Sequence, residues 1–178
     1  FILHVSIYQP KKNVERIITA YALLKRRFSI GEKLVIVGVQ PKERLLRLGV
    51  KLGLSPRDIM FTGVVPEKSL SYFYSAAKVF AFPSLHESFG MPLVEAMACG
   101  CPVVTSNVFA CPEVVGDAAL LVDPFNVKEI ALAIYRVLSD EDLRTKLVRK
   151  GLERSKHFTW EKSALMHLKV YRAVIEER

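Results

Sequence analysis

Short apolar runs alternate along the chain with longer segments in which apolar residues recur at helical spacing. Continuous apolar runs predict strands buried on both faces, because a strand with one exposed face would alternate apolar and polar residues. The predicted strands are residues 1–7, 34–39, 59–62, 78–82, 102–105 and 119–122. The predicted helices are residues 14–28, 41–52, 67–77, 92–99, 127–138, 141–157 and 160–176. This alternation predicts an α/β, Rossmann-like parallel sheet of about six strands with helices on both faces.

The ends of several predicted helices carry capping signals. Asn13 and Thr159 stand where N-cap side chains are favoured. Ser139 with Asp142 has the spacing of a capping box between two helices. Pro41 suits the first position of its helix, because its missing N–H would have no partner there.

Length and composition indicate one domain taken from a longer protein. The chain has 178 residues, of which 51% are hydrophobic, and can bury a sizeable core. No run approaches the ~20 apolar residues of a membrane span. The chain begins inside a strand-like run without an initiator methionine. We therefore expect residues 1–178 to form a single domain, which a missing domain precedes in the full protein.

The net charge of +8 suits an anionic partner, although a solvated basic surface would give the same balance. No aromatic-basic motif supports nucleic-acid binding, so we expect no such partner. Cys99, Cys101 and Cys111 form no paired framework, which predicts reduced thiols and a cytoplasmic setting. No histidine cluster completes a zinc site, so no metal is predicted.

Ligands of open α/β sheets bind at the carboxyl ends of the strands. In this chain the corresponding loops are residues 8–13, 38–41, 63–66 and 83–91. Lys11 and Lys12 stand just before a helix, where the macrodipole disfavours each cation by ~0.3–1 kcal/mol. A bound phosphate would reverse that sign. The alternative is a pair of lysines that point into water.

The second and third loops carry weaker signals. Gly38 ends the second strand, and a glycine there lets a ligand approach the backbone closely. Val64 and Val65 follow the third strand, where small apolar side chains beside free backbone groups could hold a planar base. Ordinary tight turns would explain both features, and at Val64 and Val65 a tight turn is the favoured explanation.

The segment of residues 83–96 is more specific. Pro92 suits the first turn of a helix, and the free amides around Gly90 can receive an anion. Glu87 and Glu95 lie on either side of this turn. Because a carboxylate repels phosphate, we expect both to accept hydrogen bonds from paired sugar hydroxyls instead. The alternatives are a solvated loop carboxylate for Glu87 and a helix-stabilising first-turn acid for Glu95.

This segment resembles the signature of retaining GT-B glycosyltransferases of family 4. The residues that carry the likeness are Pro83, Ser84, Glu87, Ser88, Phe89, Gly90, Pro92, Glu95, Ala96, Ala98, Gly100, Pro102, Val103 and Val104. Further likenesses lie at residues 10–13, 112–119 and 158–161. The resemblance implies the C-terminal, nucleotide-sugar-binding half of a two-domain GT-B enzyme.

The resemblance also implies a role for each matching residue. Glu87 faces the hydroxyls of the donor sugar, and Glu95 binds the ribose. Lys12 neutralises the phosphates of the leaving nucleotide, so that no metal or other cofactor is required. The remaining donor-binding residues that we expect are Lys11, Gly38, Val64, Val65, Ser88, Phe89, Gly90, Met91 and Leu93.

The first loop departs from the family pattern, because Ser6 and Ile7 stand where many members have Gly-Arg. We expect Lys11 to supply the missing second cation. The subgroup with two basic residues before asparagine includes mannosyltransferases. GDP-mannose is therefore our first expectation for the donor and a UDP-hexose our second.

The resemblance implies retaining transfer to a saccharide or lipid-linked acceptor held mostly by the missing domain. The isolated domain should then bind nucleotide but transfer little or no sugar. The resemblance implies that residues 159–178 reach toward the missing domain. Core packing is nevertheless the expected explanation for most of the apolar residues at helical spacing, which are Trp160, Leu165, Leu168, Tyr171 and Val174. The basic surface could meet the inner face of a membrane. The alternative is a non-catalytic nucleotide-binding or regulatory module.

Overall fold

A computed structural model of the chain describes residues 1–40 and 43–176. Its six strands form one sheet in the order β3-β2-β1-β4-β5-β6, and every neighbouring pair is parallel. The strands are β1 (Ile2–Val5), β2 (Leu34–Val37), β3 (Ile59–Gly63), β4 (Val79–Phe82), β5 (Val103–Ser106) and β6 (Ala119–Val122). The predicted fold class is therefore confirmed.

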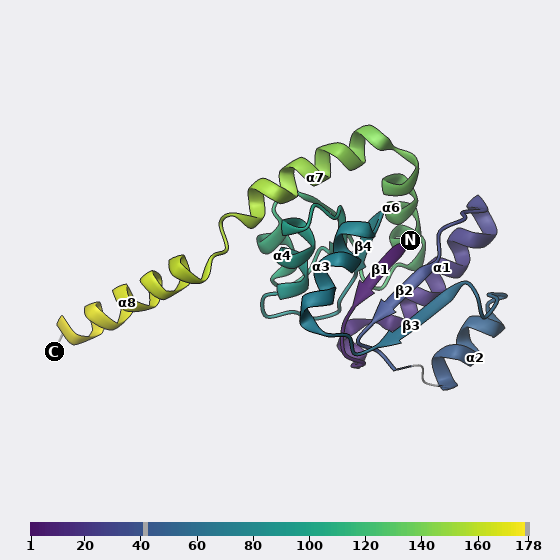
Figure 1. The fold of residues 1–178 in the computed structure, drawn as a ribbon, viewed down its shortest axis with the longest axis horizontal. Helices are drawn as coiled ribbons and strands as arrows, with labels where there is room; N and C mark the ends of the chain where they lie inside the picture. The colour runs from purple at the N-terminus through teal and green to yellow at the C-terminus, as the bar shows by residue number, and fades with distance from the viewer. Residues whose placement is uncertain (41–42, 177–178) are drawn as a thin grey trace.

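The helices connect these strands and cover the sheet (Figure 1). They are the 3-10 turn η1 (Pro10–Lys12) and the α-helices α1 (Val14–Phe28), α2 (Glu43–Lys51), α3 (Glu67–Ala76), α4 (Met91–Ala98), α5 (Cys111–Val115), α6 (Val127–Ser139), α7 (Glu141–Ser155) and α8 (Trp160–Glu176). The sequence predicted all of them within a few residues except η1 and α5. The prediction that Pro41 opens a helix lies outside the described residues.

The core has two halves because successive strand residues point to opposite faces of the sheet. On one face, Ile2 and its equivalents in the other strands pack against α1, α2 and α6. On the other face, Leu3 and its equivalents pack against α3, α4 and α5. All four residues of β1, β2, β4 and β5 are buried, as expected for strands covered on both sides.

Two of the predicted helix caps need correction. Asp140, not a box of Ser139 and Asp142, caps α7, because its Oδ1 accepts a 2.9 Å hydrogen bond from the Leu143 amide. Ser139 instead ends α6, and its hydroxyl donates to the Tyr135 carbonyl. Asn13 occupies the N-cap position of α1, but its side chain makes no capping bond.

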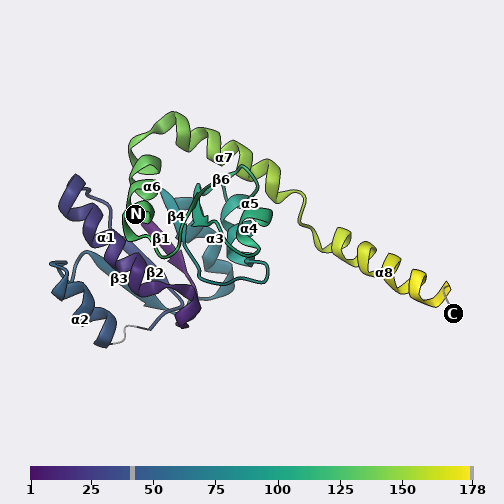
Figure 2. The same ribbon diagram turned by 180° about the vertical axis from the view of Figure 1, so that it is seen from behind.

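Thr159 caps α8 as predicted, since its Oγ1 accepts a hydrogen bond from the Lys162 amide at 3.2 Å. Beyond this cap, α8 extends away from the body of the domain (Figures 1 and 2). None of the residues of α8 is buried, and Trp160 keeps 79% of its surface exposed. The prediction that the apolar residues of this helix pack in the core of the chain is therefore wrong. None of the helices in the described ranges combines the length and hydrophobicity needed to cross a membrane.

Candidate functional site

The loops after β1 and β4 meet at the carboxyl edge of the sheet. The amide of Leu85 donates to the Lys11 carbonyl at 2.7 Å. The side-chain amide of Asn13 donates to the carbonyls of Pro83 and Pro124 at 2.8 Å each. Asn13 therefore ties three loops together, which explains why its buried side chain does not cap α1.

Lys12 and Glu87 form a buried ion pair at this edge. Lys12 Nζ lies 2.7 Å from Glu87 Oε1, and the two side chains are only 13% and 9% exposed. Ser84 Oγ donates to the same carboxylate oxygen at 2.6 Å. Lys12 Nζ also lies 5.1 Å from the centre of the Phe82 ring. Lys11, the neighbouring lysine in the same loop, is exposed, whereas Lys12 is not.

The N-terminus of α4 lies next to this pair in the chain. Gly90 occupies its N-cap position with a φ of +93°, a conformation that favours glycine. Within the described part of the chain, no protein group accepts a hydrogen bond from the amides of Phe89, Gly90 or Met91. The Leu93 amide donates to the Gly90 carbonyl at 2.8 Å. Of these expected donor-binding residues, the structure therefore leaves the amides of the first three available for an anion, whereas the Leu93 amide is engaged within the chain.

Glu95 lies in the second turn of α4, whose first turn contains no acidic residue. The alternative that Glu95 stabilises the helix as a first-turn acid is therefore wrong. Its Oε2 accepts a 2.9 Å hydrogen bond from the hydroxyl of Tyr74 on α3. Burial raises the pKa of Tyr74 well above its usual range, and the charge of Glu95 raises it further, so the phenol stays protonated.

Gly38 follows β2 and lies between Ser6, just after β1, and Gly63, the last residue of β3. Its amide donates to the Gly63 carbonyl at 2.7 Å, and its φ is +85°. A Cβ at Gly38 would lie 2.5 Å from the Ser6 carbonyl oxygen. The chain's own backbone therefore approaches Gly38 closely at this point. In the next loop, Val64 is 78% exposed, whereas Val65 packs against the core.

His4 lies fully buried on β1, beneath the site, with its ring stacked on Phe82. Its Nδ1 must donate to the Ala81 carbonyl, 2.9 Å away, because a carbonyl can only accept. Nε2 then accepts from the Ser6 hydroxyl at 2.7 Å. Burial, together with the nearby charge of Lys12, lowers the pKa of His4 to about 4. His4 is therefore neutral near pH 7 and adds no charge to the site.

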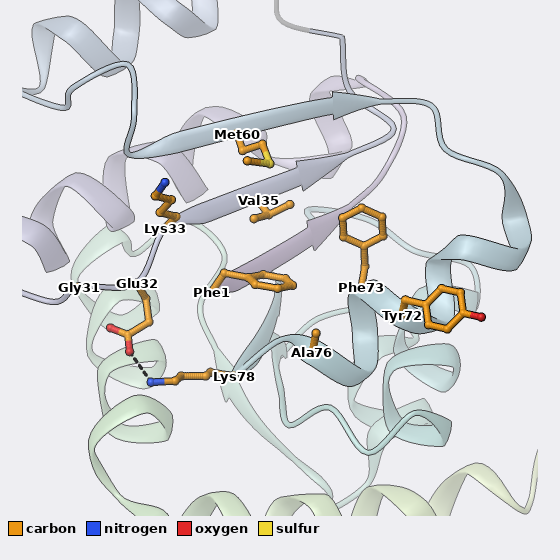
Figure 3. Close-up of a pocket in the computed structure, with 10 residues that line it drawn as sticks. All are labelled: Phe1, Gly31, Glu32, Lys33, Val35, Met60, Tyr72, Phe73, Ala76 and Lys78. Carbon is orange, nitrogen blue, oxygen red and sulfur yellow. Dashed lines mark hydrogen bonds and ion pairs between the residues drawn. The ribbon is translucent and has the colours of Figure 1, made fainter.

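A pocket of about 630 Å³ opens at the opposite, amino-terminal end of the sheet (Figure 3). Val35 and Met60 from the sheet and Phe73 from α3 line it. The ion pair of Glu32 and Lys78 lies at its rim, with a 2.7 Å separation. No residue of the predicted donor site lines this pocket.

The described cysteines and acidic residues form no group of metal ligands. Across residues 1–40 and 43–176, no three His, Cys, Asp or Glu side chains are grouped as metal ligands. Cys99, Cys101 and Cys111 are free thiols. Burial raises the pKa of Cys101 to about 12 and also raises the pKa of the other two thiols, so all three stay protonated near pH 7.

Two residues that support the glutamates were absent from the predicted site. Ser84 belongs to the quoted signature, and its place three residues before Glu87 is a usable signal. Tyr74 lies 21 residues before Glu95 on another helix. No spacing in the sequence marks that contact, since only the packing of α3 beside α4 creates it.

Known proteins resemble this chain in sequence. The sequence model of the glycosyl transferases group 1 family matches residues 1–154. O-antigen chain mannosyltransferase B from Escherichia coli is 36% identical over 173 residues, which cover 97% of this chain and 45% of that protein. The chain thus spans less than half the length of this curated relative.

Solved structures share the fold of this chain. Sucrose-phosphate synthase from Thermosynechococcus elongatus superposes with a TM-score of 0.86 at 31% identity, over 99% of this chain and 46% of that one. The C-terminal domain of a glycosyl transferase group 1 family protein from Francisella tularensis gives a TM-score of 0.77 at 24% identity. It covers 88% of this chain and 85% of that domain, which supports the shared fold. The predicted resemblance to a C-terminal GT-B domain is confirmed.

Proposed function

Since the chain belongs to the glycosyl transferases group 1 family, we propose that it binds the nucleotide-sugar donor of a retaining hexosyltransferase. We take GDP-mannose as the first donor to test and a UDP-hexose as the second. The E. coli relative is named a mannosyltransferase, which supports mannose as the transferred sugar. The buried pair of Lys12 and Glu87 beside the amides at the start of α4 is the observation that carries this proposal.

The proposed donor has its diphosphate between Lys12 and the amides of Phe89, Gly90 and Met91. Cleavage of the bond between the sugar's anomeric carbon and the phosphate oxygen leaves negative charge on the departing nucleotide. A cation and preorganised amides stabilise such charge as it develops. In this proposal Lys11, exposed at the same loop, supplies a second cation, and no metal ion is needed.

Glu87 is placed to orient the donor sugar. Its Oε1 is occupied by Lys12 and Ser84, whereas no described residue donates to Oε2. Oε2 can therefore accept a hydrogen bond from a sugar hydroxyl while the ion pair persists. In this proposal Glu95 likewise accepts a hydrogen bond from a ribose hydroxyl. Val64, which is exposed, lies with Val65 against the base. Gly38 and Ser88 complete the donor-binding set that we propose.

The acceptor lies outside this proposed donor site. We propose that a further domain of the full protein holds a saccharide or lipid-linked acceptor, and that exposed α8 reaches that domain. The isolated chain should then transfer little or no sugar. We also propose a cytoplasmic enzyme that meets the inner face of a membrane through its basic surface. Sedimentation with anionic vesicles at two salt concentrations tests that contact, because high salt should release the chain.

Calorimetric titration with GDP, UDP, GDP-mannose and UDP-glucose tests the donor assignment. Lys12→Ala should weaken nucleotide binding by roughly tenfold or more, since ~1.4 kcal/mol corresponds to a factor of ten. Lys78→Ala is the matched control, because Lys78 forms its ion pair at the opposite end of the sheet. It should leave every affinity unchanged.

The same experiment should distinguish the roles of the two glutamates. Glu95→Ala should weaken GDP and GDP-mannose equally, and Glu87→Ala should weaken mainly GDP-mannose. Equal effects of both variants on bare nucleotide would refute these separate roles. If no nucleotide binds, the donor proposal fails. Nucleotide binding to which the sugar adds nothing would favour a non-catalytic nucleotide-binding module.

A further inference from the structure

We propose that Tyr74 is a positioning residue for Glu95, which it holds in the orientation that binds the ribose. This inference rests on the proposed function and extends it to a residue outside the donor site. Tyr74 lies on α3, and its hydroxyl donates to Glu95 Oε2 at 2.9 Å. It needs no contact with the nucleotide, because it acts through the carboxylate.

The ring of Tyr74 is held firmly in place. The residue is 1% exposed and packs within the core on the α3–α5 face of the sheet. Its ring meets Phe80 edge to face, with 5.3 Å between the ring centres and 83° between the planes. A buried ring fixed in this way has a hydroxyl in one place, and so the carboxylate that accepts from it has a defined orientation.

Glu95 keeps one oxygen available in this arrangement. The residue is partly exposed, and among residues 1–40 and 43–176 no group donates to its Oε1. A flexible glutamate would lose conformational freedom when it binds ribose, and this loss weakens binding. The hydrogen bond from Tyr74 imposes that order before the ligand arrives.

The other glutamate of the pair is held in a parallel way. Ser84 is buried and donates to Glu87 Oε1 at 2.6 Å, while Oε2 has no donor in the described part of the chain. Ser84 is itself held, since the Ser106 hydroxyl donates to the Ser84 carbonyl. Each glutamate thus has one oxygen fixed by a hydroxyl from the core and one oxygen available.

The competing explanation is that Glu95 merely satisfies a buried phenol. Tyr21, the other tyrosine that is only 1% exposed, shows that backbone carbonyls suffice for that purpose. Its hydroxyl donates to the carbonyls of Glu32 and Asp58 at 2.9 and 3.1 Å. A partly exposed carboxylate is not needed to keep a phenol satisfied in this fold, which favours a positioning role for Tyr74.

The experiment compares GDP with 2′,3′-dideoxy-GDP, which lacks the ribose hydroxyls, on the wild-type chain and on Tyr74→Phe. Loss of positioning should raise the dissociation constant for GDP by roughly 2–10-fold. The constant for the dideoxy nucleotide should stay unchanged. The preference for GDP should therefore shrink, whereas a merely structural defect would weaken both ligands alike. In a Glu95→Ala background, Tyr74→Phe should have no further effect on GDP.

Tyr21→Phe is the matched control, because it removes the hydroxyl of an equally buried tyrosine on the opposite face of the sheet. It should leave both dissociation constants unchanged. If Tyr74→Phe keeps the wild-type preference for GDP, or lowers both affinities equally, the inference is overturned while donor binding stands. If the wild-type chain binds neither GDP nor UDP, the proposed function fails and the inference fails with it.

Discussion

Breaking the ion pair of Lys12 and Glu87 should lower stability as well as binding. At 2.7 Å and an effective dielectric constant of ~20, the Coulomb attraction is about 6 kcal/mol before the cost of desolvation. Removing one partner of a buried pair typically costs ~3–5 kcal/mol, because the other charge is left uncompensated. The small remaining exposure and the hydrogen bond from Ser84 place our expectation at the lower end.

Lys12→Met removes the charge but keeps an unbranched side chain near the Phe82 ring. We expect it to lower the free energy of unfolding by about 3 kcal/mol. The melting temperature should then fall by roughly 6–12 °C in a domain of this size. Glu87→Gln should cost less, about 2 kcal/mol, because the amide oxygen can still accept from Ser84.

The double variant, Lys12→Met with Glu87→Gln, removes both charges together. Its free energy of unfolding should lie within about 1.5 kcal/mol of wild type, since replacing a whole buried pair is far less costly than breaking it. Its nucleotide affinity should nevertheless stay low. Urea unfolding at pH 7, with calorimetric binding, measures both quantities. If the two single effects simply add in the double variant, the pair is not coupled and the reasoning is refuted.

The remaining predictions concern stability at three other places in the fold. Gly38→Ala should cost about 2–4 kcal/mol in urea unfolding, because the new Cβ would meet a carbonyl oxygen at 2.5 Å and the φ is +85°. Gly31→Ala, with nothing within 4 Å, is its control, and equal effects would count against the argument. The lowered pKa of His4, about 4 against 6.5, means that the unfolded chain takes up this proton first as pH falls. The contribution of His4 to the free energy of unfolding should therefore drop by about 1.6 kcal/mol between pH 6.5 and pH 5, and a His4→Gln variant that shows the same total drop would contradict this. Asp140→Ala should cost about 1 kcal/mol through loss of the α7 cap, while Ser139→Ala should be neutral, and a reversed order in thermal melts would restore the capping box.

Local sequence patterns were sufficient for the elements and for the family. Buried parallel strands leave continuous apolar runs, and the helices between them follow the 3.6-residue period, so most boundaries fell within a few residues. The features that the sequence did not predict are either too short to show a period or depend on residues far away in the chain. The five residues of α5 are too few to show a period. The side chain of Asn13 binds carbonyls 70 and 111 residues away rather than the helix that it precedes.

The sequence by itself determined an α/β domain, its order of elements and the signature that contains Glu87 and Glu95, because these are properties of neighbouring residues. Only the tertiary structure decided what each residue contacts. It paired Lys12 with Glu87 across 75 positions and brought Tyr74 to Glu95 through the packing of two helices. It also placed Gly38 against the Ser6 carbonyl, where a Cβ would not fit. Such contacts depend on how the parallel strands are ordered in the sheet, since that order decides which loops meet at its carboxyl edge.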